Sequence, residues 1–329
     1  MAEQKQNPVV IVVLIIIIVG ALLFNLKRTA SRPAASPLPS GQPAPASRGG
    51  VLSEAPLPVS QKATSSGKKI TAPGIKVKFK QLTATLAYDT QPAFSPDGRE
   101  IAYASFNQGR QNIYILRLNS NEKPVPLTQG DYLDSQPCWS PGGSTIIFSS
   151  NRQGKNGLYW VDKFTGEITP LNKEGTSPAI SPDGEWLAFA DQHNIWMMKL
   201  ASKEFTPLTK SGYNDWPSWG KGGKEIYFSG GGFIKVYNTE GSEVRAITSS
   251  GFSDYPFVSP YDGRLVYISL ESGAYDLWIM NPDGSKKLQV TADEAREYFP
   301  YWSPDGQAIV FASDSLGLSH LWLLTLPAE

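Results

Sequence analysis

Few side chains in this sequence could carry out nucleophilic, acid–base or metal chemistry. The 329 residues include two histidines, His193 and His320, and one cysteine, Cys138. An ordinary zinc or copper site needs more ligands of these types. The sequence also contains no Gly-x-Ser-x-Gly nucleophile motif and no phosphate-binding glycine motif. We therefore predict a non-catalytic protein with no bound cofactor.

Aromatic, arginine and carboxylate side chains instead collect in segments that we expect to be loops on one face of the molecule. The candidates are Tyr88, Asp89, Arg110, Tyr132, Asp134, Arg152, Asp215, Trp216, Asp254, Tyr255, Arg296 and Glu297. Aromatic residues and arginine dominate the energetics of protein interfaces, so this set predicts a surface that binds a protein partner. The alternative is structural: the acids bond backbone N–H groups while the aromatics pack between repeats. A calcium ion held by the carboxylates is a further alternative, although no Asp-x-Asp-x-Asp-Gly string occurs.

An eight-residue motif that occurs six times positions these segments. Its first copy is Gln91-Pro92-Ala93-Phe94-Ser95-Pro96-Asp97-Gly98, and the leading prolines of the six copies are residues 92, 137, 178, 217, 256 and 300. Their spacing of 39 to 45 residues is typical of a radially repeated sheet unit. We expect the proline to open a short strand and Ser-Pro-Asp-Gly to form a tight turn, because Pro fixes φ and Gly accepts a positive φ.

Three more strands follow the turn in each repeat. The third and fifth residues after the turn glycine are apolar in every copy, as Ile101 and Tyr103 are in the first. This period of two predicts a strand, and the apolar residues between them predict burial on both faces. A third strand such as Asn112 to Ile115 and a fourth marked by pairs such as Leu127-Thr128 complete a four-stranded propeller blade.

The ends of the chain are expected to meet in one blade. The last repeat stops after its third strand, whereas Leu82-Thr83 precedes Pro92 by the same interval that separates Leu127 from Pro137. We therefore predict that Val77 to Thr83 forms the outer strand of the last blade and closes the ring. Residues 76–329 are predicted to be an all-β domain, a six-bladed β-propeller of four-stranded antiparallel blades.

The motif resembles the repeats of TolB-type β-propellers, which also form the propeller of prolyl oligopeptidase relatives. The resemblance rests on Pro-x-Phe/Trp-Ser-Pro-Asp-Gly followed by an apolar strand, and it covers residues 76 to 327. It implies a six-bladed propeller with a protein partner in the cell envelope, as in the Tol-Pal system. TolB proteins carry an α/β domain before the propeller, and this chain has a different N-terminal region in its place.

That region is predicted to contain a membrane anchor and a linker. Residues 8–24 carry no charge and would span about 26 Å as a helix, close to the thickness of the hydrocarbon core. We assign residues 1–28 to an uncleaved N-terminal anchor, because no small-x-small cleavage site follows the apolar run; a cleaved signal peptide is the alternative. Residues 29–75 are rich in Pro, Ser and Ala, lack aromatic residues and are predicted to be a disordered linker.

The orientation of the anchor is predicted from two opposing signals. Lys27, Arg28 and Arg32 follow the span while Lys5 precedes it, and the positive-inside rule by itself favours a cytoplasmic propeller. The resemblance implies export, and a long tether suits an envelope protein. We expect a single-pass membrane protein with its N-terminus inside and its propeller outside the cytoplasm.

These observations favour a membrane-anchored propeller that binds a protein in the cell envelope. The formal net charge of zero argues against a nucleic-acid partner. The alternative from another class is a propeller enzyme, a lyase or lactonase that acts on a carbohydrate-like substrate at a metal in the channel.

Overall fold

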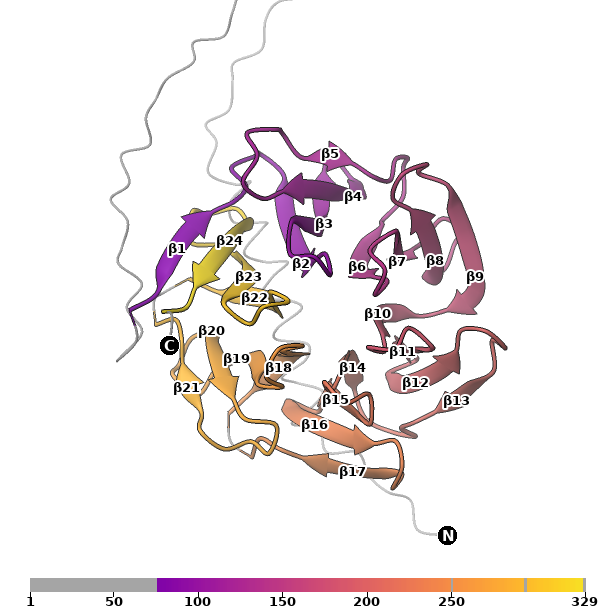
Figure 1. Cartoon of the computed structure of the whole chain (residues 1–329), viewed down its shortest axis with the longest axis vertical. Helices are drawn as coiled ribbons and strands as arrows, with labels where there is room; N and C mark the ends of the chain where they lie inside the picture. Colours follow the sequence, from indigo (N-terminus) through magenta and orange to yellow (C-terminus); the bar gives the residue numbers. More distant parts are fainter. Residues whose placement is uncertain (1–75, 250, 293–294, 328–329) are drawn as a thin grey trace, which may run out of the picture. The chain divides into compact units, whose positions relative to one another are not determined.

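Each copy of the repeated motif forms the innermost strand of a four-stranded antiparallel sheet, and six such sheets are arranged around a central channel (Figure 1). The computed structural model describes residues 76–249, 251–292 and 295–327. The expected anchor at residues 8–24 and the expected linker at residues 29–75 lie outside this described part. Within it, no helix has the length and apolar character to cross a membrane.

The first three blades follow one another along the chain, and each places its strands in sequence order from the channel outward. Their strands are β2 (Tyr88–Phe94), β3 (Glu100–Asn107), β4 (Arg110–Arg117), β5 (Val125–Pro126), β6 (Ser135–Trp139), β7 (Thr145–Ser150), β8 (Gly157–Asp162), β9 (Ile168–Glu174), β10 (Thr176–Ile180), β11 (Trp186–Asp191), β12 (Asn194–Lys199) and β13 (Phe205–Pro207).

The next two blades repeat this order, and the sixth combines both ends of the chain. The remaining strands are β14 (Asn214–Trp219), β15 (Glu225–Gly230), β16 (Phe233–Asn238), β17 (Glu243–Ala246), β18 (Ser253–Val258), β19 (Leu265–Ser269), β20 (Asp276–Met280), β21 (Leu288–Gln289), β22 (Glu297–Trp302), β23 (Ala308–Ser313), β24 (His320–Thr325) and β1 (Lys78–Gln81).

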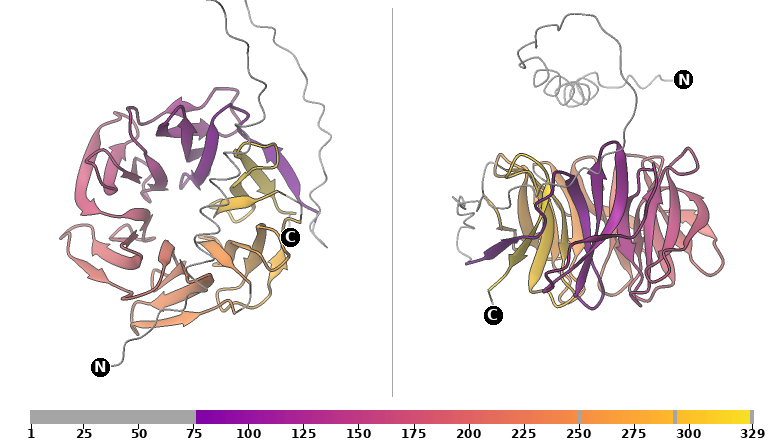
Figure 2. Two further views of the ribbon diagram at one scale, coloured as in Figure 1. Left: turned by 180° about the vertical axis from the view of Figure 1, so that it is seen from behind. Right: turned by 90° about the horizontal axis from the view of Figure 1, so that it is seen from above.

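The strand β1 closes the ring as predicted. It pairs antiparallel with β24, with Phe79 opposite Leu324, and lies on the outside of the last blade (Figure 2). Leu82 N donates to Leu321 O at 2.8 Å, and Leu321 N donates to Thr83 Oγ1 at 3.0 Å. The six-bladed, all-β architecture and its closure by the N-terminal strand are confirmed.

The threonine of the recurring Leu-Thr pairs caps the third strand of its blade. Thr128 Oγ1 accepts a hydrogen bond from Ile113 N at 2.9 Å, and the equivalent threonines of the third, fourth, fifth and sixth blades do the same. A buried N–H without an acceptor is costly, so this hydroxyl has a fixed structural role. The Leu-Thr pair therefore marks the end of the fourth strand, directly after β5 in the first blade.

The innermost strands differ from the prediction at their proline. We expected the proline to open the strand, but each strand begins two to four residues before it. A β-bulge shifts the register there, as between Thr90 and Ala93, and the residue before the proline has φ between 51° and 57° in all six blades. The bulge turns this residue toward the channel, where the inner edge of the blade has no neighbouring strand.

The second strands form the core of the propeller. Six successive residues of β3 are buried, and Ile101, Ile146, Leu187, Ile226, Leu265 and Ile309 at the equivalent position of each blade have no exposed surface. Each core cluster joins residues of neighbouring blades, as Val266 and Phe311 are joined in one of them. The prediction of burial on both faces of these strands is confirmed.

Candidate functional site

The propeller has two faces that differ in the segments they carry. The loop face bears the loops that join each fourth strand to the next inner strand and each second strand to its third strand. The turn face bears the Ser-Pro-Asp-Gly turns and the turns between third and fourth strands. The predicted partner-binding residues all belong to the loop face or to the strand ends beneath it.

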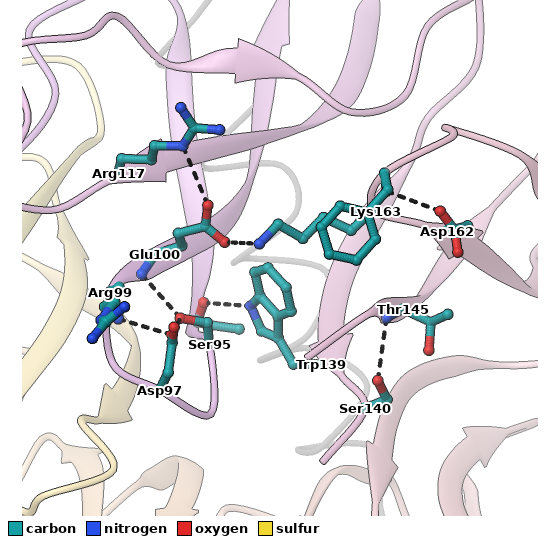
Figure 3. Close-up of polar contacts among 12 residues, drawn as sticks. Ser95, Asp97, Arg99, Glu100, Arg117, Trp139, Ser140, Thr145, Asp162 and Lys163 are labelled. Atoms are coloured by element: carbon teal, nitrogen blue, oxygen red, sulfur yellow. Dashed lines mark hydrogen bonds and ion pairs between the residues drawn. The ribbon is translucent and has the colours of Figure 1, made fainter. Parts of the chain in front are cut away.

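The hydrogen bonds of the first Ser-Pro-Asp-Gly turn have a structural role (Figure 3). Ser95 Oγ donates to Asp97 Oδ1 at 2.6 Å and accepts from Glu100 N at 2.9 Å, while Arg99 N donates to Asp97 Oδ1 at 3.1 Å. The hydrogen bond from Ser95 has the largest effect on the pKa of Asp97 and lowers it below its ordinary value. The bond from Arg99 N lowers this pKa further. Gly98 has φ +71°, as the turn requires. The third and sixth copies repeat the serine–aspartate bond.

A charged cluster beside this turn joins the first two blades (Figure 3). The nearly buried carboxylate of Glu100 contacts the ammonium of Lys163 from the second blade and accepts from Arg117 Nε at 3.4 Å. Lys163 also lies 5.5 Å from the centre of the Trp139 ring, and Trp139 Nε1 donates to Ala93 O at 3.1 Å. The Glu100–Lys163 and Trp139–Ala93 contacts cross the blade boundary and stabilise the ring.

Three of the predicted partner-binding acids are buried beneath the loop face. Asp89, Asp134 and Glu297 have no exposed surface, and each precedes its blade proline by three residues. Asp89 accepts from Ser105 Oγ at 2.6 Å, and Glu297 accepts from two hydroxyl groups. Asp134 pairs with Arg152. These carboxylates hold loops and neighbouring strands together, which agrees with the structural alternative for this class of residue.

Arg152 is also held inside its blade. Its Nη2 lies 2.8 and 2.9 Å from the two carboxylate oxygens of Asp134, and 15% of its side chain is exposed. The guanidinium lies 5.0 to 5.2 Å from the ring centres of Tyr132, Phe148 and Tyr159. With its charge and its planar faces engaged, it positions the exposed Tyr132 ring on the loop face.

Four predicted residues remain accessible on the loop face: Tyr88, Arg110, Tyr132 and Arg296. Tyr88 and Tyr132 expose 42% and 39% of their surface. Arg110 Nε lies 2.5 Å from Asp131 in a pair that is open to solvent. These four side chains are therefore open to solvent on the loop face.

Sequence reasoning missed the exposed leucines and Phe106 that accompany them. Fourteen large hydrophobic side chains are exposed in the described part of the chain, and nine of these lie on the loop face. The nine are Leu86, Tyr88, Phe106, Tyr132, Leu133, Tyr213, Phe252, Leu316 and Leu318. Leu86, with 92% exposed, is the extreme case. The available signal was the presence of leucine and aromatic residues in segments where polar turn residues are usual.

The predicted residues Trp216 and Tyr255 occupy a ring at the channel. This pre-proline ring consists of the six residues with positive φ that precede the blade prolines: Gln91, Gln136, Ser177, Trp216, Tyr255 and Phe299. One half is a chain of hydrogen bonds. Gln136 N donates to Gln91 Oε1 at 3.0 Å, Ser177 N donates to Gln136 Oε1 at 2.9 Å, and Ser177 Oγ donates to Asp215 Oδ1 at 2.6 Å.

The other half of the pre-proline ring is aromatic. The ring centres of Trp216, Tyr255 and Phe299 lie 4.3 to 4.9 Å from one another, although these residues come from three different blades. An aromatic side chain cannot accept the N–H of its neighbour as glutamine does. Asp215 and Asp254 take over this role, because each accepts the following residue's N–H at 2.8 Å.

Burial raises the pKa of both carboxyl groups. For Asp254 it outweighs the hydrogen bonds from Ser229 and Tyr255 N, the nearby Asp215 adds to it, and the pKa rises to about 6. Burial likewise raises the pKa of Tyr255. The charge of Asp254 therefore changes near pH 6.

The remaining candidates for chemistry lie apart from one another. His193 contacts Tyr213, with ring centres 4.9 Å apart, and His320 is buried at the start of β24. Burial raises the pKa of the Cys138 thiol to about 11. No group of three or more His, Cys, Asp and Glu side chains is placed to hold a metal ion in residues 76–249, 251–292 and 295–327.

Comparison with known proteins identifies the repeat family. The family model described as the TolB beta propeller domain matches residues 68–230. An uncharacterized protein of Agrobacterium fabrum is 31% identical over 160 residues, which cover 45% of this chain and 53% of the relative. The Tol-Pal system protein TolB of Francisella tularensis subsp. tularensis is 27% identical over 278 residues, which cover 65% of this chain and 54% of the relative. The chain thus spans about half the length of these curated relatives.

Solved structures show the same fold at low sequence identity. A structure of a putative TolB from Agrobacterium tumefaciens aligns with a TM-score of 0.58 and 22% identity, covering 77% of this chain and 98% of that one. An oligogalacturonate lyase in complex with manganese aligns with a TM-score of 0.52 and 17% identity, covering 78% of this chain and 95% of that one. The repeats, the closed ring of six blades and these matches together show that the chain carries a TolB-type β-propeller.

Proposed function

We propose that this propeller is a non-catalytic module that binds a protein partner in the cell envelope, and that the partner docks on the loop face. The observation that carries the proposal is the concentration of exposed apolar and aromatic side chains on this face. Such side chains usually mark protein interfaces, and a tyrosine or leucine becomes an anchor when a partner removes it from water. The relatives named as Tol-Pal system proteins support an envelope partner.

The proposed binding surface is smaller and more apolar than the sequence suggested. It consists of the accessible residues Tyr88, Arg110, Tyr132 and Arg296 together with the leucines of the neighbouring loops, Leu86 and Leu316 among them. Asp89, Asp134, Arg152 and Glu297 support it from below. In this proposal residues 8–24 anchor the protein in the membrane and residues 29–75 extend the propeller into the extracytoplasmic space.

Photo-crosslinking tests the docking face. A photoreactive phenylalanine analogue replaces Leu86 or Leu316 on the loop face, or Phe164 on the turn face as a matched control that is 77% exposed. We expect the two loop-face positions to crosslink to one and the same envelope protein and the control position to leave it unlabelled. Leu86→Glu should then weaken that complex about tenfold or more, and Phe164→Glu should leave its affinity unchanged. Equal labelling from both faces would refute the proposal.

A further inference from the structure

The channel contains a cavity of about 400 Å³, a size found for small-molecule sites. Its lining begins at the pre-proline ring and ends among exposed residues of the turn face, the prolines Pro96, Pro141, Pro182 and Pro260 with Lys221. No described residue of the loops on the opposite face lines it. The cavity therefore opens at the turn face, and the pre-proline ring forms its floor.

The wall of this cavity is apolar. All six blade prolines and the side chains of Trp139, Trp219, Phe257 and Trp302 line it. The Phe257 and Tyr301 rings, from the fifth and sixth blades, stack 3.6 Å apart between their centres. A ligand that fits this wall has an apolar body.

The wall also offers few backbone donors to a ligand. The blade prolines have no N–H, and the N–H groups of Gln136, Ser177, Trp216 and Tyr255 are bonded to side chains. Farther along the wall, Ile180 N donates to Cys138 Sγ at 3.4 Å and Val258 N donates to Ser218 Oγ at 3.0 Å. A peptide must find partners for its own N–H and C=O groups when it is buried, whereas a hydrocarbon chain needs none. The wall therefore suits hydrocarbon better than peptide.

One charge lies at the mouth. Among the described residues that line the cavity, Lys221 alone is charged, and it stands where the other blades have the second proline of the motif. Its Nζ donates to Tyr261 O at 2.5 Å, which holds the ammonium at the rim. The nearby turn carboxylates, such as Asp97 and Asp183, do not line the cavity and accept hydrogen bonds from their own turns.

We propose that the channel binds an anionic amphiphile, with its hydrocarbon chain among the prolines and aromatic rings and its carboxylate at Lys221. Five residues along each inner strand separate the pre-proline ring from the second proline of the motif or, in the fourth blade, from Lys221. An extended chain of this length spans about 17 Å. A medium-length acyl chain occupies this depth in an extended form. The site is on the opposite face from the proposed protein-binding surface, so the two can be occupied together.

Dodecanoate binding to the purified full chain tests the assignment. Quenching or enhancement of tryptophan fluorescence reports occupancy, because four tryptophans are among the described residues that line the cavity. Cys138, the only cysteine of the chain, lies in the same lining and gives a second readout. We expect saturable binding and slower alkylation of Cys138 by N-ethylmaleimide at alkaline pH when dodecanoate is bound.

Two variants and a control locate the ligand. Lys221→Met should weaken dodecanoate binding about tenfold and leave the neutral dodecanol unaffected, whereas Lys224→Met, which removes an exposed charge outside the lining, should change neither. Ala179→Phe introduces the side chain that the fifth blade carries at the same position and should abolish binding of both. The proposal is overturned by an absence of saturable binding, by equal effects of the two lysine variants, by retained binding in Ala179→Phe, or by equal protection of Cys138 by an apolar peptide.

Discussion

The closure of the ring depends on one hydroxyl group whose removal has a predictable cost. Thr83 Oγ1 accepts the N–H of Leu321, a residue with no exposed surface, and so joins the two ends of the chain. Thr83→Val keeps the shape of the side chain but leaves this N–H without an acceptor. A buried unpaired donor costs about 1 to 3 kcal/mol. For a domain of this size about 2 kcal/mol lowers the melting temperature by roughly 4 to 8 °C.

Thermal unfolding followed by circular dichroism measures this cost, and Thr128→Val is the matched control. Thr128 makes the same bond to Ile113 within the first blade, so its loss should lower the melting temperature by a similar amount. Hydrogen exchange separates the two variants, because Thr83→Val alone should accelerate exchange in β1 and β24. A melting temperature for Thr83→Val within about 1 °C of the wild type would show that the bond does not stabilise the closure.

Removal of the whole closing strand extends the same test. A chain that begins at residue 76 retains β1, whereas one that begins at Thr85 lacks it and exposes the edge of β24. We expect the longer chain to unfold cooperatively and the shorter one to lose the native fold or to aggregate. Equal melting temperatures for the two chains would contradict the closure argument.

Three further predictions concern the channel carboxylate, the aromatic half of the pre-proline ring and the topology. Burial raises the pKa of Asp254 from 3.8 to about 6, so between these pH values the folded state keeps a proton that the unfolded chain releases. The free energy of unfolding should therefore fall by up to about 3 kcal/mol as pH rises through this window. Denaturant titrations of Asp254→Asn should lack this pH dependence, and an unchanged slope would exclude Asp254 as its source. Trp216→Ala should lower the stability by about 3 kcal/mol because it removes contacts with Tyr255 and Phe299, and wild-type melting would assign Trp216 to binding alone. Protease added to spheroplasts should degrade the propeller, and complete protection would refute its extracytoplasmic placement.

The architecture could be predicted from the sequence because its repeats are punctuated by residues with narrow backbone preferences. Proline and glycine at fixed positions in the motif, with two apolar residues after each turn, indicated six blades and their period. The position of Leu82-Thr83 indicated the closure. The bulge escaped prediction because a residue before proline ordinarily adopts an extended conformation. Here a left-handed residue precedes every blade proline, a geometry that the channel edge permits and that pairing within a flat sheet would not.

The candidate site was predicted less completely, because residue type does not reveal burial. Asp89, Asp134 and Glu297 have the composition of an interface but fill a repeated structural position. Their common distance from the blade proline was a readable sign of this role, since Gly175, Asn214 and Ser253 stand at the same place in the other blades. The exposed leucines of the loop face carry no repeat signal, and only the structure shows them together.

Departures from the repeat separate the residues that the fold requires from those that a ligand could require. Every blade needs its proline, its turn glycine and its buried second strand, and all six copies supply them. The fold does not require one residue type at the channel-facing positions. These positions vary from glutamine to tryptophan in the pre-proline ring and from proline to lysine at the mouth. The blades repeat around the ring, but the side chains that face the channel form a polar side, an aromatic side and one cation. The fold of the blades does not require this difference between the sides. The cation at the mouth of an apolar wall is the part of this asymmetry that assigns a ligand to the channel, because it matches a ligand with a charged end and an apolar body.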